Sequence, residues 1–421
     1  MFDQTIESFQ LPNGLRVVIE PMNAVQSAAM TLMVPAGSVR DHAGRQGTAA
    51  VLTQMIQRGA GEYSAQEHSA RMDNLGLQRN VSVGTGHISV SAATTSDRFC
   101  ESIAEIGLMI CEPHLQDEDF EPAQEIVRQG LRSLEDEPQH LLGKALRQHS
   151  LPVPWNQHSD GELDDIDRLT LNVVRDHFDH FVRPDEAILG IAGHVDISKI
   201  RAVIDEVFGG WASRPADPLA VQPFQFGVHH LNHDSAQTHV GLSWPTVPYR
   251  DEKYFEAWAV VGLLSGGMSS RLFTEVRERR GLCYSISASI STLRDEGRVF
   301  VYAGTTPERA QDTLDVTIEQ ILNIGEGITE GELQRCKARA KSALIMQQES
   351  TMARAGAVAR DTYHLDRVVT LSEIHRRIDS LTVPIVQEFA RQTLPQEMVL
   401  VTLGPESLDA AKLPQSPTVV V

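Results

Sequence analysis

The feature that most constrains the fold is an internal repeat that relates the two halves of the chain. Three pairs of segments resemble each other at an offset of 211 or 212 residues. The pairs are 88–99 with 299–310, 166–178 with 378–390, and 187–196 with 398–407. Within them, Thr94 aligns with Thr305 and Gly193 with Gly404. Three separate matches at nearly one offset indicate two homologous halves.

Each half shows the same coarse order of secondary structure. A strand hairpin precedes a helix, then come two alternating strands, several segments with helical spacing and a closing strand. Strands grouped early and helices grouped later predict an α+β fold with two homologous domains, each a mostly antiparallel sheet with helices packed on one face. The expected boundaries are 1–208 for the first domain, 209–227 for a linker and 228–421 for the second. The linker contains three prolines and three glycines and has no periodicity.

The composition excludes several classes of partner. A formal net charge of −19 argues against non-specific nucleic-acid binding, which needs a basic surface. No apolar stretch of about 18 residues is present, so no membrane-spanning helix is expected. The first 20 residues predict two short strands joined by an Asn13-Gly14 turn and lack the pattern of a signal peptide, so a cytoplasmic location is expected. The four cysteines form no CxxC pair and are expected to be buried, reduced thiols.

The segment 47–60, GTAAVLTQMIQRGA, predicts a helix with an unusual second face. Its apolar side chains recur at spacings of three and four residues, at Ala49, Leu52, Met55 and Ile56. The opposite face carries Ala50, Thr53, Gln54 and Gln57, and no ionisable side chain lies between Gly47 and Gln57. This face therefore offers no group for acid–base chemistry, in a chain in which 22% of residues are charged.

A second motif lies in the segment 269–287, SSRLFTEVRERRGLCYSIS. A helix is expected to end at Gly281, which tolerates a positive φ, and a strand is expected to begin at once. Arg277 lies in the last helical turn, and Tyr284 is the third residue beyond the glycine. Tyr284 could instead be a core residue of the strand, and Arg277 one more charge on a charged helix. In the repeat, Gly281 and Leu282 align with Gly76 and Leu77, at an offset of 205 residues. At this offset Arg277 and Tyr284 align with Met72 and Arg79, so the shared fold does not require the Arg/Tyr pair.

The repeat, the Asn-Gly hairpin and these two motifs together resemble the insulinase/pitrilysin family of zinc metallopeptidases, in particular its small bacterial and mitochondrial-processing branch. In that family the opening helix carries H-x-x-E-H, in which the histidines bind zinc and the glutamate activates the bound water. The resemblance places these three chemical positions on Ala50, Thr53 and Gln54. The third zinc ligand, a glutamate on a later helix, falls on Gly130, beside Gln129. None of these residues is an adequate zinc ligand.

The resemblance implies a division of labour between two chains. This chain would form half of a clamshell around a peptide chamber and act as the non-catalytic subunit, without a cofactor of its own. Arg277 and Tyr284 would bind the substrate peptide at the zinc site of a partner that carries H-x-x-E-H. The main alternative is a structural or peptide-binding homologue with no role in proteolysis, like the core subunits of cytochrome bc complexes. Whether two different chains or two copies of this chain pair stays open.

Two histidine-rich segments are weaker candidates for a metal site. His177 and His180 lie one helical turn apart in RDHFDHF, where a solvated helix end is the simpler interpretation. The segment 229–240, HHLNHDSAQTHV, contains four histidines where the entry to a strand is expected.

Overall fold

The computed structural model describes residues 4–215, 218–224 and 226–414 of the chain, which folds into two compact units. Unit 1 comprises the described residues of 1–133, 153–221 and 345–370, and unit 2 those of 134–152, 222–344 and 371–421. This division differs from the expected boundaries at 209–227 because each half of the chain contributes one helix to the other unit. Part of the expected linker, residues 216–217 and 225, lies outside the described residues.

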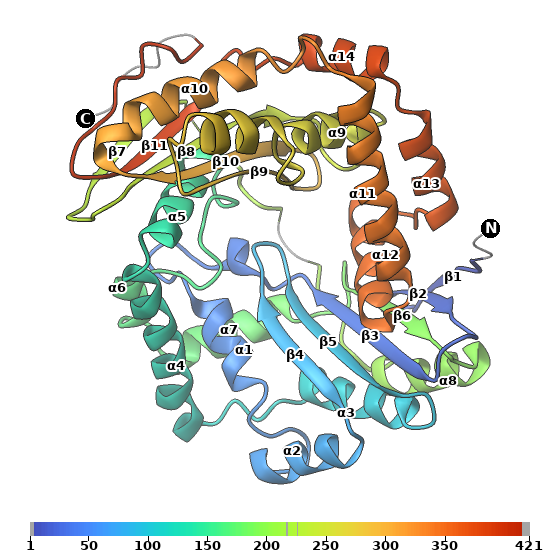
Figure 1. Cartoon of the computed structure of the whole chain (residues 1–421). Coiled ribbons are helices and arrows are strands. Elements are labelled where there is room, and N and C mark those ends of the chain that lie inside the picture. The colour runs from blue at the N-terminus through green and yellow to red at the C-terminus, as the bar shows by residue number, and fades with distance from the viewer. Residues whose placement is uncertain (1–3, 216–217, 225, 415–421) are drawn as a thin grey trace. The chain divides into compact units, whose positions relative to one another are not determined.

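The sheet of unit 1 has six strands in the order β1-β2-β6-β3-β5-β4 (Figure 1). They are β1 (Glu7–Gln10), β2 (Arg16–Pro21), β3 (Ser27–Val34), β4 (Gln78–Val83), β5 (Ile88–Thr95) and β6 (Ile188–Gly193). All neighbours are antiparallel except β2 and β6. The turn between β1 and β2 is the expected one, because Gly14 has φ +100° and its N–H donates to the Leu11 carbonyl.

The sheet of unit 2 repeats this arrangement with five strands in the order β7-β11-β8-β10-β9. They are β7 (Val228–Asn232), β8 (Thr238–Thr246), β9 (Ser285–Thr292), β10 (Gly297–Thr305) and β11 (Val399–Gly404). Its one parallel pair, β7 with β11, takes the place of β2 with β6 in unit 1. Apart from the additional edge strand β1 of unit 1, the two sheets have the same strand order, which confirms the two homologous halves and the α+β class.

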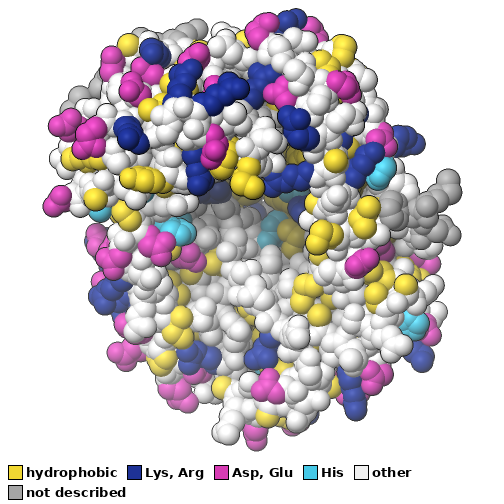
Figure 2. Space-filling model, in the orientation of Figure 1, with side chains coloured by type: hydrophobic (Ala, Val, Ile, Leu, Met, Phe, Trp, Pro, Cys, Tyr) yellow, Lys and Arg dark blue, Asp and Glu magenta, His cyan; other side chains and the backbone are white. Residues whose placement is uncertain are grey.

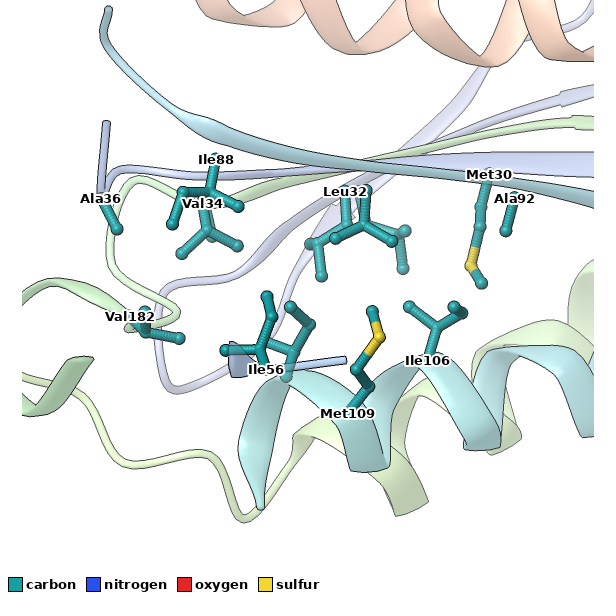
Figure 3. Close-up of a cluster of buried hydrophobic side chains, with 14 of the residues drawn as sticks. Met30, Leu32, Val34, Ala36, Ile56, Ile88, Ala92, Ile106, Met109 and Val182 are labelled. Carbon is teal, nitrogen blue, oxygen red and sulfur yellow. The ribbon is translucent and has the colours of Figure 1, made fainter. Parts of the chain in front are cut away.

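Most helices of each unit cover one face of its sheet. Those of unit 1 are α1 (Thr48–Met55), α2 (Ala65–Asn74), α3 (Phe99–Cys111), α4 (Asp117–Glu135), α6 (Leu163–Ile166), α7 (Leu171–Phe181) and α8 (Ile197–Phe208). Those of unit 2 are α9 (Tyr254–Ser265), α10 (Ala310–Leu322), α11 (Glu330–Gln348), α13 (Leu371–Ser380) and α14 (Val383–Gln392). Figure 3 shows the resulting core of unit 1, in which Met30 and Leu32 of β3 face Ile106 and Met109 of α3.

Helices also cover the opposite faces, which corrects the expectation of helices on one face only. In unit 1, α12 (Thr351–Leu365) packs on β6 and β3, where Gly190 lets the helix backbone approach closely. A Cβ at Gly190 would lie 2.4 Å from the Ala355 carbonyl oxygen. Arg354 of this helix also forms a buried ion pair with Glu20 of β2, at 2.7 Å. In unit 2, α5 (Pro138–Ser150) packs on β8 and β11 in the same way.

This exchange of helices explains the burial of the central strands. Every residue of β6 and of β11 is buried, because each strand has helices on both faces. None of the helices in the described parts of the chain has the length and apolar character needed to cross a bilayer.

Candidate functional site

The helix α1 begins at the position that the sequence predicts, directly after Gly47. Gly47 precedes it with φ +98°, and the expected apolar face at Ala49, Leu52 and Met55 is fully buried. The second face is largely covered as well, since Ala50 and Thr53 are each only 3% exposed. The Thr53 hydroxyl donates to the Ala50 carbonyl oxygen at 2.6 Å, so its hydrogen-bonding capacity is used within the helix.

The donor set of this region does not fit a zinc ion. Ala50 has no donor atom, and Thr53 and Gln54 offer only neutral oxygens in place of imidazole, thiolate or carboxylate. Gly130 lies exposed on α4, and a Cβ built there would have no atom within 4 Å. Over the parts of the chain that the structure describes, no three His, Cys, Asp or Glu side chains are grouped so that they could hold a metal ion.

A buried acid–base pair lies at the start of α1, and sequence analysis did not identify it. The carboxylate of Asp41 accepts hydrogen bonds from the backbone N–H of Gly47 at 2.7 Å and of Ala49 at 3.0 Å. Its Oδ1 lies 3.6 Å from Nδ1 of His177 on α7, and both side chains are almost completely buried. His177 Nε2 donates to the Ala36 carbonyl at 3.0 Å. The pair thus joins three segments around the N-terminus of α1.

Burial shifts both members of this pair toward their neutral forms. It raises the pKa of Asp41 to about 7, although the backbone N–H groups of Gly47 and Ala49 oppose the shift. It lowers the pKa of His177 to about 4. The metal site considered for His177 and His180 does not form, because His177 points into the core while His180 is exposed and bonds the Asp176 carbonyl.

Three of the four histidines in 229–240 also have separate partners. The His229 ring stacks on that of His149 in α5, with centroids 3.5 Å apart. His230 bonds the Thr402 hydroxyl and His239 bonds the Tyr302 hydroxyl, each at 2.9 Å. This segment therefore supplies packing and hydrogen bonds to the sheet of unit 2.

The Arg/Tyr motif begins in an unusual helical segment of unit 2. Residues Phe273–Arg279 form a π-helical stretch, η2, a geometry that is frequent at functional sites. The chain then turns at Gly281, whose φ of +61° confirms the expected end of the helix. The strand β9 starts only at Ser285, later than expected. Before it, the Leu282 carbonyl accepts hydrogen bonds from the hydroxyls of Thr305 and Thr313.

The side chains of Arg277 and Tyr284 are both exposed to solvent. Tyr284 is 60% exposed, so it is not the core residue that its alternation with Ile286 allowed. Its backbone N–H bonds the Gly304 carbonyl at 2.9 Å, which fixes the start of the side chain. Arg277 is exposed, and its guanidinium lies 4.8 Å from the centroid of the Phe273 ring.

Arg277 differs from its neighbours on the same segment. Arg279 pairs with Glu275 at 2.5 Å and Arg280 with Glu319 at 3.6 Å, whereas Arg277 forms no ion pair with any residue that the structure describes. Figure 2 shows several Lys and Arg side chains gathered on the face of unit 2 that carries α10. Asp and Glu side chains lie among them in the same view, so this face of unit 2 carries charges of both signs.

The cysteines do not offer a nucleophile. All four are free, and burial raises the pKa of Cys111 to about 12 and those of Cys283 and Cys336 to about 11. Only Cys283 is classed as fully buried, so the expectation of four buried thiols holds in full for that residue alone, and the other three are half-buried.

Comparisons with known proteins agree with this architecture. A family model described as insulinase (peptidase family M16) matches residues 16–153, and one described as peptidase M16 inactive domain matches residues 168–340. An uncharacterized zinc protease of Mycobacterium bovis is 27% identical over 418 residues, covering 96% of this chain and 94% of its own length.

Solved structures show the same fold. A peptidase M16 inactive domain from Pseudomonas fluorescens superposes with a TM-score of 0.88 at 19% identity, covering 96% of this chain and 99% of that one. A chain of complex III2 from Candida albicans superposes with a TM-score of 0.81 at 16% identity, covering 95% and 96%. The resemblance seen in the sequence is confirmed, and the chain belongs to the insulinase family of peptidases, family M16.

Proposed function

We propose that this chain is the non-catalytic, substrate-binding subunit of a heterodimeric zinc peptidase that degrades or processes peptides. The partner would be a family member with an intact H-x-x-E-H helix, and the zinc ion would belong to that partner. The observation that carries the proposal is a contrast within one chain. By the resemblance, the helix α1 lacks the histidines and the glutamate of the zinc motif. Arg277 and Tyr284 instead have exposed side chains that form no hydrogen bond or ion pair with a described residue, although the Arg277 guanidinium lies near the Phe273 ring.

The two side chains suit the binding of a peptide backbone. A guanidinium and a phenol both donate hydrogen bonds, and both can stabilise negative charge that develops on a carbonyl oxygen. Because the Arg277 guanidinium forms no ion pair among the described residues, binding a carbonyl oxygen breaks no existing salt bridge. The backbone bond from Tyr284 to Gly304 keeps the phenol anchored next to the edge strand β9.

The comparisons support two different assignments. The Mycobacterium relative bears the name of a zinc protease, and the Pseudomonas structure that of an inactive domain, both in keeping with a peptidase subunit. The complex III2 neighbour instead favours the alternative, a structural or peptide-binding homologue with no role in proteolysis. The exposed side chains of Arg277, which forms no ion pair among the described residues, and of Tyr284 favour the first assignment, since both donors are available to a peptide.

Assembly and metal content provide the first test. The chain purified alone is expected to hold no stoichiometric zinc after dialysis and to cleave no peptide. Co-expression with an H-x-x-E-H chain from the same genome is expected to give a one-to-one complex by light scattering, with chelator-sensitive peptidase activity. One zinc per chain together with activity of the isolated chain would exclude the proposal, as would a failure to bind every such partner.

Kinetics of the complex test the roles of the two residues. Tyr284→Phe removes an exposed hydroxyl, so the melting temperature is expected to stay unchanged. If this donor stabilises the transition state, kcat falls by about a hundredfold or more; if it only holds the peptide, KM rises and kcat stays. Arg279→Ala on the same segment is the matched control for Arg277→Ala, because Arg279 already pairs with Glu275. Equal kinetics for Arg277→Ala, Tyr284→Phe and the control would instead favour the structural alternative.

A further inference from the structure

Arg298 in unit 2 has a buried guanidinium that forms no ion pair with any residue in the described parts of the chain. Arg298 on β10 is only 5% exposed, and its Nε and Nη1 have no hydrogen-bond partner within the described parts of the chain. Its Cζ lies 4.0 Å from the centroid of the Phe224 ring and 5.8 Å from that of Phe226. Aromatic rings attract a cation, but they leave these N–H groups without an oxygen acceptor.

This side chain is charged at neutral pH. Burial lowers the pKa of Arg298 to about 10, which is still well above 7, and the charge of exposed Glu296 opposes that shift. An unpaired charge in a buried position is costly, because it loses its hydration and gains no counter-charge. An anion that reached the guanidinium would therefore recover part of that cost.

A second unused donor lies beside it on the same face of the sheet. The Ser243 hydroxyl on β8 is buried and has no hydrogen-bond partner in the described structure. Ser243 lies directly opposite Phe300, and Arg298 is two residues from Phe300 on the same strand. Arg298 and Ser243 are thus diagonal neighbours on one face of adjacent strands, with Cα atoms about 7–8 Å apart.

The surroundings favour a small oxyanion over water alone. This face of the sheet is the one covered by α5, where Leu142, Leu146 and Val399 form an apolar cluster. A carboxylate or phosphate group can accept from a guanidinium and a hydroxyl together, and such charge-assisted bonds are strong in an apolar environment.

We propose that the α5-covered face of the unit 2 sheet contains an oxyanion site in which Arg298 and Ser243 bind a carboxylate or phosphate group. All its residues belong to unit 2, and the site is independent of the peptidase role proposed for Arg277 and Tyr284. Because the Phe224 ring covers the guanidinium, entry of the ligand requires this side chain to move.

The direction in which one substitution changes the melting temperature distinguishes this site from a structural role of Arg298. Arg298→Met replaces an unpaired buried charge by an apolar side chain, so its melting temperature in sodium chloride is expected to exceed that of the wild type. Sodium phosphate or sodium acetate at the same ionic strength is expected to raise the melting temperature of the wild type and not that of Arg298→Met. Arg250→Met, which disrupts an exposed ion pair with Asp295, is the matched control. Phosphate or acetate should raise its melting temperature by as much as that of the wild type.

Titration calorimetry with the same anions measures how much the Ser243 hydroxyl contributes to the affinity. Ser243→Ala should fold normally, because the Ser243 hydroxyl bonds nothing in the described structure. It should raise the dissociation constant of the anion several-fold, and Arg298→Met should raise it by about tenfold or more. A lower melting temperature of Arg298→Met in chloride, or equal increments in Arg298→Met and wild type, would overturn the proposal.

A peptide pair separates the two sources of the oxyanion. A hexapeptide with a single glutamate and its glutamine counterpart are added to the wild type. Stabilisation by the glutamate peptide and not by its counterpart assigns the ligand to a peptide carboxylate, whereas stabilisation by free phosphate or acetate alone assigns it to a small anion. No stabilisation by any of these probes contradicts the site.

Discussion

Substitutions in the buried pair of Asp41 and His177 should reveal two opposite pH dependences that cancel in the wild type. Between about pH 4 and 6.5 the folded pair holds one proton, on Asp41, because its pKa is raised to about 7 and that of His177 is lowered to about 4. In the unfolded chain the pair also holds one proton in this range, on the histidine. The numbers of bound protons are equal, so the pair contributes no slope to the free energy of unfolding.

Asp41→Asn removes the carboxyl group, so that only His177 contributes to the pH dependence of the free energy of unfolding. The remaining His177 binds fewer protons in the folded state than in the unfolded state between pH 4 and 6.5. The stability of the variant relative to the wild type should therefore rise with pH across this window, and it is lost as pH falls. A shift from 6.5 to about 4 corresponds to about 3 kcal/mol in total.

His177→Gln should show the opposite trend. Asp41 then binds more protons in the folded state than in the unfolded state from about pH 4 to 7, so relative stability falls as pH rises. Its larger shift corresponds to about 4 kcal/mol. The double variant should return to the flat profile.

Urea unfolding at several pH values between 4.5 and 6.5, followed by tryptophan fluorescence, measures these differences. His180→Gln is the control, because His180 is exposed on the same helix and should keep the wild-type profile. The geometry supports the assignment of the proton, since His177 Nε2 donates to a carbonyl and leaves the Nδ1 lone pair facing Asp41. Parallel pH profiles for Asp41→Asn and the wild type would refute the reasoning.

Three further expectations follow from packing and can be checked by chemical denaturation. Gly130→Ala should raise the free energy of unfolding by about 0.5–1 kcal/mol, since the helix interior at this position has room for a Cβ; an unchanged or lower value contradicts this. Gly190→Ala should lower it by about 1–3 kcal/mol or more, because the new Cβ would collide with the Ala355 carbonyl oxygen. Arg354→Met should cost about 3–5 kcal/mol by leaving Glu20 buried without its ion-pair partner, and adding Glu20→Leu should recover most of the loss.

Periodic and local signals in the sequence were sufficient for much of the fold. The repeat anticipated two homologous sheets, and the Asn13-Gly14 turn and the end of the helix before Gly281 were located to the residue. Turn glycines and apolar periodicity depend on interactions within a few residues, so a linear sequence displays them directly. The absence of ionisable side chains from the second face of α1 was visible for the same reason.

The exchange of α5 and α12 was not predictable in this way. Both segments have ordinary helical patterns, and nothing local specifies which sheet they cover. The segments that they contact lie far away in the chain, as with Glu20 and Arg354, which are 334 residues apart. The domain boundaries at 208 and 228 therefore followed the repeat, whereas the compact units follow the packing.

The sequence by itself determined the family and the two-sheet α+β class, because these depend on residue identity at aligned positions. It also predicts that Ala50, Thr53, Gln54 and Gly130 stand where the family has its zinc motif, and this stays a prediction. Only the tertiary structure decided which polar groups are paired. The exposure of Tyr284, the neutral pair of Asp41 and His177 and the unpaired charge of Arg298 all depend on neighbours from distant strands and helices. Burial and partnership control the energy of a polar group, and both are properties of the packed chain.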